Sequence, residues 1–178
     1  MSKTDIEVEA RSFITKEKYL ELIDFMKKHA EFLKEDNQIT YYFSGDVDVR
    51  IQKNDFFSKI WIKEGNIHDE HRKETEIRFA KERFEALEKL FLALGYEIDI
   101  KWFRKRNEFK WKGITVAIDD TKSYGYIIEL EKMSSGGDKE EIYKELLTRL
   151  DELGVIITPK EEFARKFKEY KDTWRELL

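Results

Sequence analysis

The sequence predicts an α+β fold. We expect a closed eight-stranded antiparallel β-barrel that encloses its own polar face, with helices packed outside. Segments with alternating polar and apolar residues recur along the chain, which is typical of strands with one buried face. On most of them acidic and basic side chains share one face, while two amphipathic helical segments also need apolar surface to pack against. An apolar exterior under the helices and a charged interior satisfy both requirements.

Length and composition limit the possible classes. A chain of 178 residues with one Pro and eight Gly leaves little room for linkers, so we expect a single domain over residues 1–178. Charged residues make up 40% of the chain, but the net charge is −4. This balance lacks the positive excess that nucleic-acid binding requires.

The location of the protein is predicted from what the sequence lacks. Without Cys there is no disulfide framework and no thiolate zinc site, which fits a reducing compartment. The start Met-Ser-Lys-Thr-Asp has no apolar signal region, and no apolar run approaches the ~20 residues that span a bilayer. We therefore expect a soluble, cytoplasmic protein without membrane contact.

The first half of the chain starts with a strand and a helix. Residues 7–11 alternate between charged and apolar side chains, and Thr15 is a suitable N-cap for the helix that follows. Turn residues at 44–46 and 54–55 then separate meander strands, and Gly95 is placed to end a second helix. The strands expected in this half cover residues 7–11, 39–43, 47–52, 59–63 and 73–79.

The second half returns to strands and ends in helices. A turn at Gly113 separates two strands, and the strands expected here cover residues 97–106, 108–112, 114–119 and 125–133. A helix is predicted from Asp138 to about Leu153, and Pro159 opens another that runs toward Trp174.

Charged side chains share faces on at least six of these segments. One such face is ordinary on a half-exposed sheet, where cross-strand ion pairs line the solvent side. Their recurrence is what a polar cavity binding metal ions and phosphate groups requires. In strand order the residues on these faces are Glu7, Glu9 and Arg11; Asp48, Arg50 and Gln52; Lys59, Trp61 and Lys63; Arg72, Glu74, Glu76 and Arg78; Trp102, Arg104 and Arg106; Asp119; and Glu129 and Glu131.

These residues resemble the motifs of the CYTH family, also called triphosphate tunnel metalloenzymes, and the resemblance runs nearly end to end. The family signature E-x-E-x-K is similar to Glu7-Val8-Glu9-Ala10-Arg11, with Arg in place of Lys. The basic strand resembles residues 104–109, and the late acidic block resembles residues 116–131. In the family's R-x-R strand the second Arg is replaced by Gln52.

The resemblance implies an eight-stranded tunnel that grips a triphosphate with basic residues and holds Mg²⁺ or Mn²⁺ with acidic ones. It assigns catalytic roles to Glu7, Glu9 and Arg11. The implied triphosphate-binding residues are Arg11, Arg50, Lys63, Arg104 and Arg106. The implied metal ligands are Glu7, Glu9, Asp119, Glu129 and Glu131, with Glu74 and Glu76 in a supporting role. The implied partner is a small molecule that contains a triphosphate.

Several functions stay open at this point. The favoured one is metal-dependent hydrolysis of inorganic or organic triphosphate, and the first alternative is a class IV adenylate cyclase that makes cyclic AMP and pyrophosphate. Arg11 and Gln52 depart from the family pattern, which leaves a non-catalytic polyphosphate or nucleotide sensor as another alternative. A nucleic-acid-binding domain rests only on the cluster at residues 104–106. The sequence leaves the oligomeric state open, either monomer or homodimer.

Overall fold

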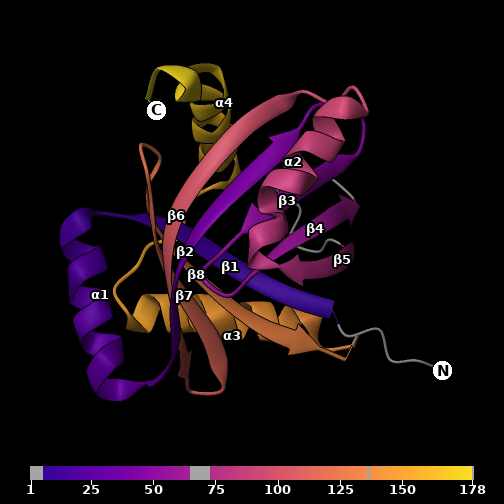
Figure 1. The fold of residues 1–178 in the computed structure, drawn as a ribbon. Coiled ribbons are helices and arrows are strands. Elements are labelled where there is room, and N and C mark those ends of the chain that lie inside the picture. The colour runs from indigo at the N-terminus through magenta and orange to yellow at the C-terminus, as the bar shows by residue number, and fades with distance from the viewer. Residues whose placement is uncertain (1–5, 65–72, 136, 178) are drawn as a thin grey trace.

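A computed structural model of the chain describes residues 6–64, 73–135 and 137–177. The elements alternate much as the sequence predicts (Figure 1). In chain order they are β1 (Ile6–Ile14), α1 (Lys16–His29), β2 (Glu31–Phe43), β3 (Asp48–Lys53), β4 (Phe57–Glu64), β5 (Lys73–Ala80), the short 3-10 helix η1 (Lys81–Arg83), α2 (Phe84–Ala93), β6 (Ile98–Trp111), β7 (Ile114–Thr121), β8 (Gly125–Ser134), α3 (Lys139–Glu152) and α4 (Lys160–Leu177).

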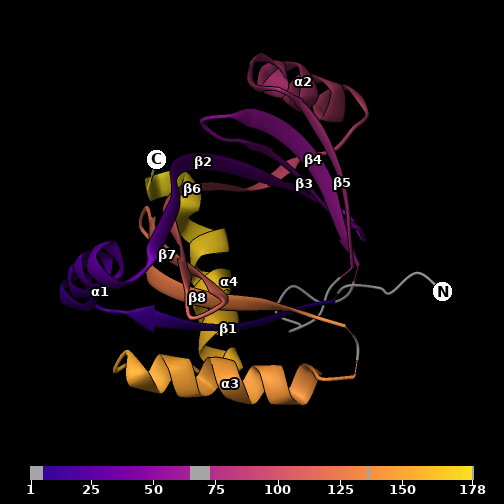
Figure 2. The same ribbon diagram turned by 90° about the horizontal axis from the view of Figure 1, so that it is seen from below.

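All eight strands belong to one antiparallel sheet with the order β1-β8-β7-β6-β2-β3-β4-β5. The sheet is strongly curved, and Figure 2 shows β3 to β5 on the opposite side of the curve from β1 and β8. Among the described residues, no ladder joins the edge strands β1 and β5. The predicted closed barrel is therefore wrong as regards hydrogen bonding, because alternation indicates which face is polar but not whether two edges meet.

Helices α1, α2 and α3 lie on the outer, convex face, where their apolar sides meet those of the strands, as predicted. The prediction is wrong for α4, which packs on the concave side because its aromatic residues cover the apolar end of that face around Ile100 and Trp102. α1 and α3 pack on β1, β6, β7 and β8 through a core that includes Met26, Phe109 and Leu146, each fully buried. α2 covers β2 and β3 through Phe84, Leu87 and Phe91. Figure 2 shows α3 under β1 and β8 and α2 over the β3 and β4 strands. The charged faces are therefore left to the concave side.

Two strands are longer than expected. β2 begins at Glu31, directly after α1, although the sequence analysis placed its start at residue 39. Residues 31–38 are polar except for the adjacent Phe32 and Leu33 and show no apolar alternation, so they read as a connection. β6 is one continuous strand, where two separate strands were expected, and it pairs with β2 over nearly its whole length. These two long strands form the middle of the sheet.

Local signals in the sequence fix several element boundaries. The Thr15 hydroxyl caps α1 by accepting a hydrogen bond from the amide of Lys18 at 3.2 Å. Gly95 follows α2 with φ of 87°, the left-handed conformation that favours glycine. Lys112 and Gly113 both have positive φ and form the two-residue turn between β6 and β7. Within the described residues, every helix is too short or too polar to span a bilayer.

Candidate functional site

The strand register brings the acidic residues of β1 and β8 together on the concave face. Glu9 lies opposite Glu131, and Arg11 lies opposite Glu129. Since Val8, Ala10 and the neighbouring apolar residues face the helices, the alternating charged residues point into the curve. Glu7 is exposed near the start of β1. Side chains from the two ends of the chain thus build one cluster of carboxylates.

The protonation of this cluster is strongly perturbed. Burial, together with the negative charge of Glu129, raises the pKa of Glu9 to about 7 and that of Glu131 to about 8. Burial would also raise the pKa of Glu129, but Arg106 and Arg104 outweigh it and lower that pKa to about 2. At neutral pH one carboxylate is firmly charged, while its two neighbours resist ionisation. A cation would relieve this repulsion.

The donor set of the acidic cluster suits a divalent metal ion in its chemistry but not yet in its geometry. Partly buried carboxylates held near one another are the hard oxygen donors that Mg²⁺ and Mn²⁺ prefer. In the described part of the chain, however, no three acidic or imidazole groups converge closely enough to form a ready-made metal site. The donor chemistry fits a divalent ion, and the positions of the side chains would have to adjust to hold one.

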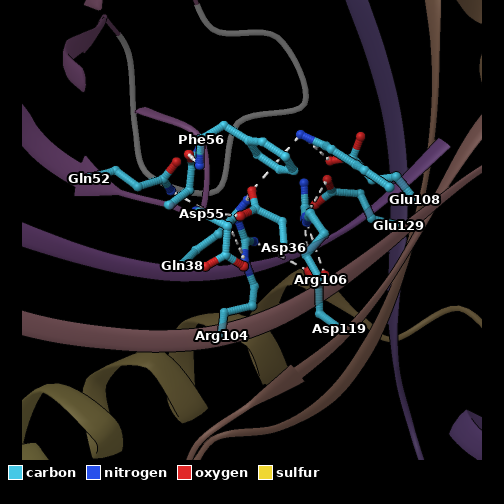
Figure 3. A network of polar contacts seen from close by, with 12 residues as sticks. Asp36, Gln38, Gln52, Asp55, Phe56, Arg104, Arg106, Glu108, Asp119 and Glu129 are labelled. Atoms are coloured by element: carbon cyan, nitrogen blue, oxygen red, sulfur yellow. Dashed lines mark hydrogen bonds and ion pairs between the residues drawn. The ribbon is translucent and has the colours of Figure 1, made fainter. Parts of the chain in front are cut away.

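Next to the acidic cluster, a network of guanidinium groups runs from β8 to β2 (Figure 3). Arg106 donates two hydrogen bonds to Asp119, at 2.9 and 2.8 Å, and a third to Glu129 at 3.2 Å. Arg104 reaches the same Asp119 at 3.3 Å. The Asp119 side chain is 2% exposed, so both guanidinium groups are fixed by one buried carboxylate.

Arg104 is oriented mainly by a neutral group. Two of its N–H groups donate to the amide oxygen of Gln38, at 3.0 and 2.5 Å. Gln38 in turn donates to Asp36 at 3.0 Å. Gln52, where the family motif has a second Arg, donates to Thr40 at 3.0 Å and to Gln38 at 3.5 Å. An amide network therefore occupies the place of the missing cation.

Arg50 has its own acidic partner. It makes a two-point contact with Asp48 on the same strand, at 2.7 and 2.5 Å, and its guanidinium lies 4.2 Å from the centre of the Tyr42 ring. A planar guanidinium held by a carboxylate and an aromatic face has a fixed orientation.

The remaining predicted residues lie on β1, β4 and β5. Arg11 approaches Glu9 at 3.9 Å and lies 4.6 Å from the centre of the Phe163 ring in α4. Lys63 lies opposite Asp48 in the β3–β4 register. Glu76 accepts hydrogen bonds from Lys59 at 2.7 Å and from Arg78 at 2.5 Å.

These two hydrogen bonds outweigh the effect of burial and lower the pKa of Glu76. The side chain of Glu74 and the whole of Arg72 lie outside the described residues.

Helix α4 covers one end of the concave face. Its Phe163 ring stacks on Phe13 with centres 4.4 Å apart, and its Tyr170 ring meets Trp102 at 5.0 Å. The Tyr170 hydroxyl and the Trp174 indole N–H donate to backbone carbonyls of β6, each at 2.8 Å. Since Phe13 and Trp102 share strand faces with Arg11 and Arg104, α4 closes the charged face at this end.

Several polar residues of the candidate site were not foreseen in the sequence analysis. All of them lie on β2, and all except Tyr42 lie in the part of this strand that was read as a connection. A period of two from Lys34 to Tyr42 was the available signal, but as far as Gln38 the segment is polar on both faces. The residues missed in this way are Lys34, Asp36, Gln38 and Tyr42.

The fold and the site together define a class of α+β proteins in which a curved antiparallel sheet collects Arg and Glu side chains on its concave face. Residues 5–162 match the CYTH domain. The chain belongs to the CYTH family. None of the curated proteins matches the chain significantly.

Solved structures share this fold. A conserved hypothetical protein from Pyrococcus furiosus is 23% identical, with a TM-score of 0.72, and the match covers 84% of this chain and 91% of that one. A Hippeastrum protein, provisionally named an adenylyl cyclase and described as having a dominant triphosphatase activity, is 16% identical with a TM-score of 0.64 and coverages of 85% and 89%. A protein from Bacillus halodurans, provisionally named an adenylate cyclase, is 16% identical with a TM-score of 0.63 and coverages of 87% and 93%.

Proposed function

We propose that the protein binds a triphosphate on its concave face and hydrolyses it in a reaction that depends on a divalent metal ion. The observation that carries this proposal is the direct contact between the carboxylate cluster and the guanidinium network at Glu129 and Arg106. A triphosphate carries about four negative charges, so it needs several cations on one side. The raised pKa values of Glu9 and Glu131 mark the acidic side as a place for a further cation.

The basic residues would bind and orient the phosphate chain. Guanidinium groups suit this role because their N–H donors meet phosphate oxygens in pairs. Arg104 is the best suited of them to bind phosphate, since its main partner is the neutral amide of Gln38. Carboxylates compensate its charge less than they compensate that of Arg106. The proposed binding residues are Arg11, Arg50, Lys63, Arg104 and Arg106.

The acidic residues would hold Mg²⁺ or Mn²⁺. When bound, such an ion offsets the charge that develops on the phosphate oxygens and activates water. The proposed ligands are Glu7, Glu9, Glu129 and Glu131. Asp119 was also predicted as a ligand, but its contacts with two guanidinium groups favour a positioning role.

The description of one structural neighbour supports hydrolysis. The Hippeastrum protein is described as having a dominant triphosphatase activity although it is provisionally named a cyclase. Two further neighbours are provisionally named adenylate cyclases, so cyclic AMP formation stays the second candidate.

Phosphorus NMR separates these candidates. The protein is incubated with Mg²⁺ and then with Mn²⁺, in a mixture of inorganic triphosphate and ATP. We expect triphosphate or ATP to be lost with the appearance of inorganic phosphate, and we expect Glu9→Gln to abolish this. Glu82→Gln is the matched control, because Glu82 is exposed and lies outside the sheet. Cyclic AMP with pyrophosphate would establish the cyclase instead, and unchanged spectra with both metals would overturn the enzyme proposal.

A further inference from the structure

The two ends of the concave face differ in what covers them. At the end formed by Phe13, Tyr42 and Trp102, the aromatic side chains of α4 fill the curve. At the opposite end lie the start of β2 and the turn between β3 and β4. A phosphate chain bound along the guanidinium network would therefore extend any attached group toward this second end.

The β3–β4 turn places one large apolar side chain at that end. Phe56 is 60% exposed. Figure 3 shows its ring turned toward Asp36 and Arg106, above the polar network. Among the described residues, no ring stacks on Phe56 and no cation lies over it. An exposed Phe is common on protein surfaces, but this one lies beside the candidate site.

The turn is held firmly, so the position of Phe56 is defined by the fold. The Asn54 side chain is buried and accepts hydrogen bonds from the amides of Phe56 at 2.8 Å and Phe57 at 2.7 Å. The Asp55 amide donates to Asp36 at 3.0 Å, and the Asp55 carboxylate accepts from the amide of Asn37 at 2.8 Å. The turn is thus anchored to β2, next to the residues that orient Arg104.

We propose that Phe56 is a stacking surface for the nucleobase of a nucleoside triphosphate. This inference rests on the proposed function and specifies its substrate class. If the phosphates lie among the guanidinium groups, the attached nucleobase would reach the second end of the concave face. There it would lie against the exposed face of the Phe56 ring. Inorganic triphosphate has nothing to place there. Stacking accepts any base, so the inference predicts a preference for nucleotides without strong selection among them.

The test compares a nucleotide with a bare phosphate chain. Binding is measured by calorimetry with Mg²⁺, using the β,γ-methylene analogues of ATP and GTP and the bismethylene analogue of inorganic triphosphate, none of which is hydrolysed. The variants are Phe56→Ala, Phe56→Trp and, as a matched control, Phe32→Ala. Phe32 is 54% exposed but packs edge-on against Phe109, which belongs to the outer core.

We expect Phe56→Ala to weaken binding of both nucleotide analogues about tenfold, which is the usual range for loss of one stacked base, and to leave the triphosphate analogue unchanged. Phe56→Trp should retain nucleotide binding, and Phe32→Ala should change neither ligand. If Phe56→Ala weakens all three ligands equally or none of them, the stacking role is wrong while the proposed function stands. If the wild-type protein binds none of the ligands, the proposed function itself fails.

Discussion

Asp119 accepts hydrogen bonds from two guanidinium groups, so a single buried carboxylate fixes the position of both. Removing one partner of a buried ion pair leaves an uncompensated charge, which costs far more than the pair contributes in net stability. The side chain therefore matters to the site whether or not it ever meets a metal ion.

We expect Asp119→Asn to lower the free energy of unfolding by about 3 kcal/mol or more, because Arg106 and Arg104 lose their shared negative partner. The measurement is urea unfolding in EDTA. Asp120→Asn is the matched control, since Asp120 is the next residue on β7 and faces the other way; we expect a change within about 0.5 kcal/mol. A deficit that occurred only with Mg²⁺ present would contradict the positioning role and favour metal ligation by Asp119.

At the residue scale, alternation in the sequence was sufficient to place the charged residues of β1, β3, β4, β6 and β8 on common faces. It could not predict which of them would touch. Gln38 illustrates the limit: a neutral residue in a polar segment shows no pattern, yet it is the main partner of Arg104. Partner choice depends on the register between β2 and β6, which is set by the packing of the whole sheet.

At the scale of the element, α4 shows what an amphipathic pattern leaves open. Its aromatic residues predict a packed face, and a helix from Pro159 toward Trp174 was expected. The pattern does not say which surface the face covers. The other three helices pack on the convex face, whereas α4 fills one end of the charged face. The same reasoning applies to β2, whose polar first half forms a strand only because β6 pairs with it.

We expect Trp174→Ala to lower the free energy of unfolding by about 3 to 5 kcal/mol, because it opens a cavity beside Ile100 and leaves the Asp99 carbonyl without its donor. Tyr170→Phe is the matched control. It keeps the ring and loses only the hydrogen bond to Lys101, so we expect a loss of about 1 kcal/mol. Urea unfolding measures both, and a loss at Trp174 no larger than at Tyr170 would show that α4 is only loosely attached.

At the scale of the whole molecule, the partly buried acidic cluster links stability to pH. Glu9 and Glu131 have folded-state pKa values of about 7 and about 8, above the ordinary 4.5. Between about pH 4.5 and pH 8, the folded protein therefore binds more protons than the unfolded chain. The stabilisation from the protonated groups is complete below about pH 4.5, and it is lost as the pH rises through 7 and 8.

We expect Glu131→Gln, which cannot ionise, to be more stable than the wild type in EDTA at pH 9, by on the order of 2 kcal/mol, and to differ little at pH 5. Thermal and urea unfolding across this range measure the difference. Mg²⁺ or Mn²⁺ should stabilise the wild type more at pH 9 than at pH 6, since protons no longer compete for the carboxylates. An equal pH dependence in both proteins would contradict the raised pKa of Glu131, and Glu82→Gln is again the control.

The pairing of β1 with β8 has a consequence for folding kinetics. Ile6 lies opposite Ser134, so the strands that carry Glu9 and Glu131 come from distant parts of the chain and meet only after a large loop has closed. A divalent ion would have no complete site in a partly folded chain. It would therefore slow unfolding and leave the refolding rate nearly unchanged. The bound ion would stabilise the native state kinetically and would not take part in the folding nucleus.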